Sequence, residues 1–411
     1  MNIIILFIAI ISLIVLSRRF GIASFMGAGF VGFFIYSIPA FINKARYFWY
    51  LNSDFYIYEP SFKAMLVYLI AWFTFFLCVV SIPDVSRYKN YHFNKGRRFS
   101  SIEFLWSGVF LSTCFATFIV FYSGDMTDSV GVIYLIGRWV VALTLIAAFA
   151  YRSLIAFIYL FVILLYWFFS GDRTLLGITL VSMLVLFAQR LYQSTYVSFY
   201  KLFNFKFFTV FFGLLFVIIF GKAIYIGVAE SRIDLIQNKI ANLNDFLSKS
   251  FEPMIIFNHV QYVVDTSFQI PVIDFLESIF SNFLIYPSAF GQSTNVYSQQ
   301  LISSFPISMS YGVAGNYWAH AYSVFGFIGV VFFALIFVFS LYACDRVFLA
   351  RARPIAILFA LLGGLIAIYT FRNGLDNFLS FLRQIFIAYF LIRFVSFFIR
   401  AILPFKKRCS L

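Results

Sequence analysis

The sequence predicts an all-α, polytopic membrane protein whose single membrane domain covers residues 1–411. Hydrophobic residues make up 63% of the chain and charged residues only 11%, and the mean hydropathy is +0.94. Apolar runs of about 17 to 25 residues recur along the whole length, and each is long enough to cross a hydrocarbon core of about 30 Å as a helix. These observations exclude a soluble globular protein.

About eleven apolar runs are expected to form transmembrane helices. They cover residues 2–17, 21–43, 63–83, 103–123, 132–151, 153–170, 174–190, 206–228, 322–343, 354–371 and 377–399. The first run lacks a charged n-region and a small-residue cleavage site, so we expect a retained helix rather than a signal peptide.

Lys and Arg set the expected orientation, because cytoplasmic loops carry an excess of both. The densest basic loop lies between residues 87 and 98, and we assign it to the cytoplasm. The N-terminus is then outside and the C-terminus inside, and most acidic residues fall outside. The net charge of +14 therefore reflects topology and attraction to anionic membrane lipids, and no domain-sized basic surface indicates nucleic acid.

One connection is much longer than the others: residues 229–321, between the eighth and ninth spans, form a large outer loop. Apolar residues at helical spacing predict amphipathic helices over residues 231–250 and 272–286. Such helices lie in the plane of the membrane interface and could roof a cavity. The stretch 286–316 has the Ser, Asn, Gln, Pro and Gly content of a loop.

No soluble-enzyme motif stands out, whether a phosphate-binding Gly-rich loop, an HExxH pair or a nucleophile elbow. The four cysteines show neither metal nor redox spacing, and we interpret them as buried small apolar residues. The sequence therefore predicts no metal ion and no cofactor.

Six cations lie near helix ends on the outer side or within a span. A role as interfacial anchor explains several of them singly, but an ionisable group inside a membrane helix usually serves a site. Converging arginines would bind and neutralise an anionic ligand, and phosphate suits their geometry best. The candidate binding residues are Arg138, Arg173, Lys222, Arg232, Arg372 and Arg383.

The last two of these arginines flank a carboxylate. Arg372 and Asp376 have i, i+4 spacing, so we expect them to pair on a helix. Arg383 follows Asp376 by two helical turns and lies inside the last apolar run, where a simple anchor is rarely found. We therefore assign Arg383 a catalytic as well as a binding role, because neutralising a leaving pyrophosphate lowers the barrier to breaking a glycosyl–phosphate bond.

A transfer reaction also requires a base that removes the proton from the attacking hydroxyl. His320, just before the ninth span, is the best-placed titratable candidate. An equal alternative is that His320 has only a structural role at the start of that span and does not act as a base. The rival carboxylates are Asp376, Glu252, Asp234 and Glu230.

Several short stretches resemble a known family. The stretch 171–176, Gly-Asp-Arg-Thr-Leu-Leu, resembles the Gly-x-Arg signature that opens a membrane helix in the O-antigen and capsule repeat-unit polymerases, the Wzy family. A span, a large outer loop and the segment 325–329, Phe-Gly-Phe-Ile-Gly, follow in the family's order. Residues 372–378 and Arg383 resemble its last helices, and 374–378 is most similar to the enterobacterial common antigen branch. The likeness in arrangement spans essentially the full chain.

This resemblance implies a metal-independent glycosyltransferase of the GT-C type in the bacterial inner membrane, with a periplasmic N-terminus and a role in O-antigen and lipopolysaccharide biosynthesis. Its substrate would be an undecaprenyl-pyrophosphate-linked oligosaccharide, and a chain-length regulator protein a further partner. The growing glycan would pass from its lipid carrier to the non-reducing end of a new lipid-linked unit. Arg173, Arg372 and Arg383 correspond to family arginines that grip pyrophosphate.

Three rivals stay open at this point, of which a receptor or lipid-binding scaffold would lack any titratable group near the arginines. The first is an O-antigen ligase, which transfers the glycan to lipid A-core; His320 fits the position of the ligase histidine, but Ala321 replaces the asparagine that usually follows it. The second is a flippase for lipid-linked oligosaccharide. A flippase would line a central cavity with its cations, whereas the unusual cations here gather on one side with a large loop.

Overall fold

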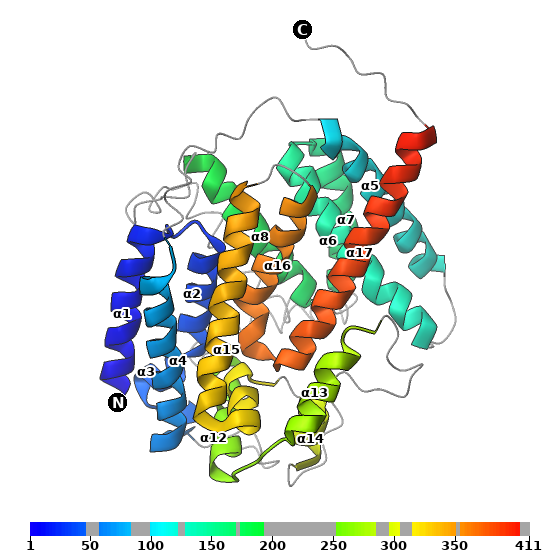
Figure 1. Cartoon of the computed structure of the whole chain (residues 1–411). Coiled ribbons are helices and arrows are strands. Elements are labelled where there is room, and N and C mark those ends of the chain that lie inside the picture. Colours follow the sequence, from blue (N-terminus) through cyan, green and yellow to red (C-terminus); the bar gives the residue numbers. More distant parts are fainter. Residues whose placement is uncertain are drawn as a thin grey trace, which may run out of the picture.

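The computed structural model of the chain describes residues 1–46, 57–83, 99–121, 128–169, 173–192, 252–284, 296–304, 315–350 and 354–402. Within these ranges the protein is almost entirely helical (Figure 1). The exception is one antiparallel pair of two-residue strands, β1 (Ala45–Arg46) and β2 (Ile57–Tyr58).

Helices supply nearly all of the described structure. In chain order they are α1 (Asn2–Arg19), α2 (Phe25–Tyr36), α3 (Ile38–Ile42), α4 (Phe62–Ser81), α5 (Phe99–Phe121), α6 (Asp128–Tyr151), α7 (Leu154–Phe169), α8 (Arg173–Tyr192), α12 (Glu252–Asp265), α13 (Val272–Ser281), α14 (Val296–Ser304), α15 (Tyr317–Ala350), α16 (Pro354–Tyr369), the short 3-10 helix η4 (Thr370–Arg372) and α17 (Leu375–Ile402).

Seven of the described helices are long and apolar enough to cross a membrane: α1, α4, α5, α6, α15, α16 and α17. Three shorter apolar helices, α2, α7 and α8, accompany them. The predicted all-α membrane class is therefore confirmed. Each predicted span that falls among the described residues overlaps one of these ten helices. The span 206–228 lies outside the described residues, so the total of eleven stays a prediction.

The predicted span 21–43 is divided into α2 and α3. Ser37 lies at the break, where its hydroxyl donates to the Phe33 carbonyl at 2.7 Å and accepts a hydrogen bond from the Trp72 indole at 3.0 Å. Pro39 follows in the first turn of α3. Proline has no N–H and fits best where a helix begins, so a new helix starts here instead of the old one continuing.

Helix α16 lies at the centre of the bundle, and 78% of its apolar stretch is buried inside the protein. Glycines allow its neighbours to come close: a Cβ on Gly32 of α2 would lie 2.0 Å from the Ala367 carbonyl oxygen, and one on Gly364 would lie 2.1 Å from the Ser182 hydroxyl of α8. Small residues at such crossings are typical of membrane helices, whose association depends on close packing rather than on expulsion of water.

The large predicted loop contains more helix than its sequence indicated. Helix α13 confirms part of the amphipathic segment 272–286, whereas the segment 231–250 lies outside the described residues. Helix α14 contradicts the prediction that 286–316 is entirely loop. The three helices α12, α13 and α14 lie together at one end of the bundle, at the bottom of Figure 1.

Helix α15 is a hairpin rather than one straight helix, and it extends beyond the predicted span 322–343 at both ends. Non-helical angles at Phe325 and a positive φ of 60° at Gly326 separate a short N-terminal segment from the long helix. The segment folds back, because the Tyr317 hydroxyl donates to the Phe333 carbonyl at 3.1 Å. Gly329 permits this, since a Cβ there would lie 2.0 Å from the Ala321 carbonyl oxygen.

Gly32→Ala is expected to destabilise the fold by about 1–3 kcal/mol, because the added methyl group overpacks the crossing of α2 and α16. Gly177→Ala in α8 is the matched control, since nothing lies within 4 Å of its Cβ position. Alanine favours helix there and is expected to leave stability unchanged or raise it by up to about 1 kcal/mol. Thermal unfolding in detergent measures both, and equal melting temperatures for the two variants would contradict the proposed crossing.

Candidate functional site

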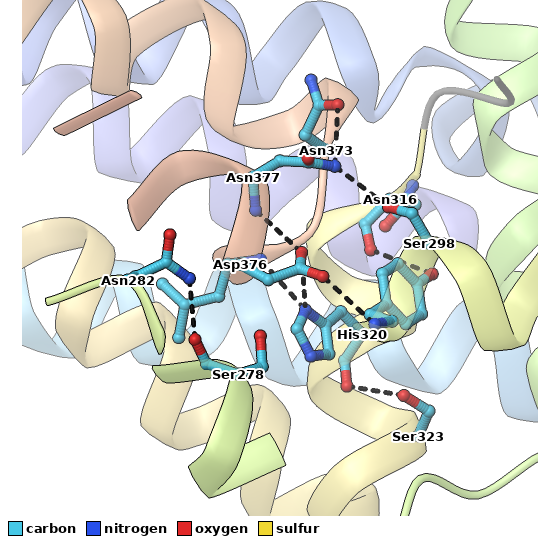
Figure 2. Close-up of polar contacts among 11 residues, drawn as sticks. Ser278, Asn282, Ser298, Asn316, His320, Ser323, Asn373, Asp376 and Asn377 are labelled. Carbon is cyan, nitrogen blue, oxygen red and sulfur yellow. Dashed lines mark hydrogen bonds and ion pairs between the residues drawn. The ribbon is translucent and has the colours of Figure 1, made fainter. Parts of the chain in front are cut away.

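A buried junction of three chain segments lies at the end of the bundle that carries α12–α14. It brings His320 of the folded-back segment of α15 next to Asp376 of α17 (Figure 2). Tyr297 of α14 lies against the same His320 ring. Asn316 fixes the first of these segments, because its side-chain oxygen accepts hydrogen bonds from the backbone N–H groups of Trp318 and Ala319 at 2.8 and 3.1 Å. This N-cap starts the segment that carries His320.

The imidazole of His320 is almost completely enclosed, with 2% of the residue exposed. It stacks on the Tyr297 ring with centroids 4.3 Å apart and an interplanar angle of 1°. Its Nδ1 accepts a hydrogen bond from the Leu375 N–H at 3.0 Å. This bond assigns the proton of the neutral ring to Nε2, so His320 is in this arrangement a donor at Nε2 and has no free basic nitrogen.

The carboxylate of Asp376 caps two helices at once. It accepts hydrogen bonds from the Tyr297 N–H of α14 at 3.1 Å and from the Asn377 N–H of α17 at 2.8 Å. Both N–H groups belong to first turns, where helices lack internal acceptors and carry partial positive charge. The nearest approach of Asp376 to the His320 Nδ1 is 3.9 Å, which is too long for a hydrogen bond.

The side chains around position 374 leave room only for glycine. A Cβ there would lie 2.6 Å from an Asp376 carboxylate oxygen and 2.7 Å from the His320 Nδ1. The Tyr297 ring fills the remaining side, and its hydroxyl donates to the Asn316 carbonyl at 3.5 Å. Burial, assisted by the Asp376 charge, raises the pKa of Tyr297, so its hydroxyl stays protonated.

Arg372 pairs with a different carboxylate from the one that its spacing predicted. Its Nε lies 2.7 Å from Glu252 at the start of α12, and the side chains are 37% and 41% exposed. The Tyr36 hydroxyl also reaches Glu252, at 3.4 Å. The expected pair with Asp376 does not form, because η4 ends at Arg372 and Asn373 is extended, so the i, i+4 geometry is lost.

Arg383 binds backbone instead of a carboxylate. Its Nη1 donates to the carbonyls of Ser281 and Leu284 at 3.3 and 3.0 Å, at the C-terminal end of α13. Its Nε is buried and has no hydrogen-bond partner among the described residues. The guanidinium therefore compensates the partial negative charge of a helix C-terminus.

Arg138 lies apart from this junction, between α6 and α17. Its Nη2 donates to the Gln384 side-chain oxygen at 3.3 Å. The guanidinium lies 5.1 Å from the ring centroids of both Trp139 and Phe381, within the range of cation–π attraction. The structure thus gives Arg138 a place in a helix interface.

The side chains of the three other predicted cations lie outside the described residues. Arg173 begins α8, but its side chain lies outside the described residues, as do Lys222 and Arg232. The rival bases Asp234 and Glu230 also lie outside them. Among the residues that the structure does describe, no three His, Cys, Asp or Glu side chains gather as they would around a metal ion.

Two site residues escaped the sequence analysis, Asn316 and Tyr297. The pattern Gly-Asn before the apolar run of α15 is an N-cap signal and could have identified Asn316. Nothing local to Tyr297 distinguishes it from 25 other tyrosines. No protein-family model, curated protein or solved structure matches the chain.

Asp376→Asn is expected to lower the free energy of unfolding by about 1–3 kcal/mol, because an amide nitrogen would replace one acceptor that faces backbone N–H groups. Thermal unfolding would measure the loss, and hydrogen exchange would place it at α14. The control is Asp265→Asn in α12, because that carboxylate accepts from the Gln261 side chain and not from the start of another helix. Unchanged protection of α14 in Asp376→Asn would contradict the double cap.

Acid is expected to destabilise the protein through His259, which is buried in α12. Burial lowers the pKa of His259 to about 4, from an ordinary 6.5. Between these two pKa values the imidazole is protonated in the unfolded chain but neutral in the folded protein. The free energy of unfolding is therefore highest above pH 6.5 and falls as the pH approaches 4, by about 3 kcal/mol in total. Melting temperatures at pH 7 and pH 5 should differ less in His259→Leu than in the wild type, and an equal difference would contradict the assignment.

Proposed function

We propose that the protein polymerises undecaprenyl-pyrophosphate-linked oligosaccharide repeat units. The growing glycan passes to the non-reducing end of a new lipid-linked unit, and undecaprenyl pyrophosphate is released. The observation that carries the proposal is the half-exposed pair of Arg372 and Glu252, a cation and a carboxylate held together beside a buried polar junction. The motifs at 171–176, 325–329 and 372–378 support it by resemblance.

The proposal includes an arrangement in the membrane. The chain is a GT-C-type enzyme of about eleven spans in the bacterial inner membrane, with a periplasmic N-terminus and a cytoplasmic C-terminus. The end that carries α12–α14 then faces the periplasm, where lipid-linked units are joined. The partners are the lipid-linked oligosaccharide, membrane lipids and a chain-length regulator protein.

The reaction forms one bond and breaks another at the same carbon. The acceptor hydroxyl oxygen attacks the anomeric carbon of the donor sugar, and the bond from that carbon to the phosphate oxygen breaks. The electron pair leaves with pyrophosphate, whose developing charge the Arg372 guanidinium neutralises. The hydroxyl proton passes to a carboxylate, and Glu252 is the described carboxylate with both partial exposure and a cation beside it.

This assignment moves the base from His320 to Glu252. The basic nitrogen of His320 is occupied by the Leu375 N–H, and the oxygens of Asp376 accept backbone hydrogen bonds. His320 and Asp376 are therefore positioning residues, which fix the turn between Arg372 and α17. An O-antigen ligase would use the same chemistry with lipid A-core as acceptor.

Glu252→Gln and Arg372→Ala are expected to reduce polymerisation in purified enzyme by about 10²-fold or more, because one removes the base and the other the charge that stabilises the leaving group. The assay supplies synthetic lipid-linked repeat units and separates the products on a gel. Arg393→Ala, an exposed arginine farther along α17, is the matched control and keeps full activity.

Three outcomes would contradict the proposal. A normal product ladder from Glu252→Gln removes Glu252 as the base. Products joined to lipid A-core instead of to a second repeat unit identify a ligase. Absence of any ladder from wild-type enzyme, together with transport of the substrate across vesicles, identifies a flippase.

A further inference from the structure

Helix α13 presents three different sides. One is buried in the protein through Phe275, Ser278 and Asn282. A second carries polar groups, including Glu277 and Asp274, the latter hydrogen-bonded to Gln300 at 2.6 Å. The third is an exposed apolar stripe, defined by Ile273, Leu276, Phe280 and Phe283, which are 61%, 41%, 68% and 76% exposed.

The buried side of α13 covers the junction described above. The Phe275 ring stands edge-on to the His320 imidazole, with centroids 5.7 Å apart and an interplanar angle of 84°. The same ring lies 5.7 Å from Phe325 at the turn of the α15 hairpin and 6.1 Å from Phe333. The enclosure of His320 thus depends in part on α13.

Both ends of α13 are fastened to membrane helices. Just before it, the Ile270 N–H donates to the Ser323 carbonyl of the α15 hairpin at 2.9 Å. At its other end, Arg383 of α17 donates to the carbonyls of Ser281 and Leu284. Removal of the Arg383 side chain would release the C-terminal end of α13, while the bond from the Ile270 N–H would still hold its N-terminal end.

The depth of Arg383 indicates what lies against the exposed stripe. Arg383 is eight residues after the start of α17, or about 12 Å along its axis, and lies inside the candidate membrane span Leu375–Ala401. The C-terminal end of α13 is therefore alongside a membrane-spanning helix, not beyond it. Large apolar side chains at that level meet lipid, while a polar edge such as Glu277 suits the headgroup region.

We propose that α13 is a lipid-facing cover of the junction: its apolar stripe contacts the acyl chains at the bilayer interface, its buried side encloses His320, and Arg383 fastens it. Arg383 acts here as a positioning residue. The proposal stands on packing alone and does not depend on which reaction the site performs.

Spin-label accessibility tests the lipid contact. Leu276→Cys and Phe280→Cys on the stripe and Glu277→Cys on the polar edge are each labelled in a full chain whose four native cysteines are replaced by serine, and the protein is placed in lipid nanodiscs. We expect stripe labels to favour collisions with oxygen, which concentrates in lipid, and the Glu277 label to favour a water-soluble nickel chelate. Nickel access along the stripe would overturn the proposal, as would dipolar broadening from a second copy.

Amide hydrogen exchange tests the cover. Peptide mass spectrometry follows deuterium uptake at the backbone N–H groups of α13 and, for comparison, of α12. Arg383→Ala is expected to increase the exchange rate of α13 several-fold and to leave that of α12 unchanged. Arg383→Lys should restore protection in part, and Arg393→Ala should behave as wild type.

The internal control separates the cover from general unfolding. An equal rise in the exchange of α12 and α13 in Arg383→Ala would mean that the whole fold had loosened, and the specific role of Arg383 would be refuted. Unchanged protection of α13 in folded Arg383→Ala would refute it as well.

Discussion

The arrangement of the candidate site depends on one buried carboxylate that holds two helix N-termini together. Asp376 accepts hydrogen bonds from the first turns of α14 and α17, so these helices cannot separate without exposing N–H groups to an apolar interior. The neighbouring Leu375 N–H is thereby directed at the His320 ring, and the Tyr297 ring is brought into stack with it. Gly374 completes the junction because no side chain fits there.

Much of the fold was predictable, because the length of an apolar run is set by the thickness of the membrane and can be measured in one sequence. The prediction went wrong where a contact distant in sequence decides the structure. Helix α14 has loop composition, and its first turn is stabilised by Asp376, 79 residues away. The α15 hairpin turns at Gly326 inside a run that remains apolar on both sides, so hydropathy alone shows no boundary there.

Some residues of the candidate junction could be predicted from the sequence, but their contacts could not. The sequence identified His320, Asp376 and Arg372 from their positions near helix ends. It paired the last two by spacing, which assumes a continuous helix, whereas the backbone is extended at Asn373. The true partner of Arg372 is Glu252, and only the packing of α12 against the membrane helices brings the two together. A pairing across 120 residues has no local signal.

Ionisable groups near apolar helices proved to have two uses. Four of them satisfy helix termini, where unpaired backbone groups would otherwise be costly: Arg19 at the end of α4, Asp345 at the start of α2, Asp376 at the start of α14 and Arg383 at the end of α13. The hydrogen bonds of these four groups to backbone already serve the fold. Arg372 and Glu252 bind each other and remain partly exposed, which leaves charge for an incoming substrate. Depth in the membrane therefore does not by itself distinguish a site from a cap; the distinction lies in whether the charge is already bound to backbone.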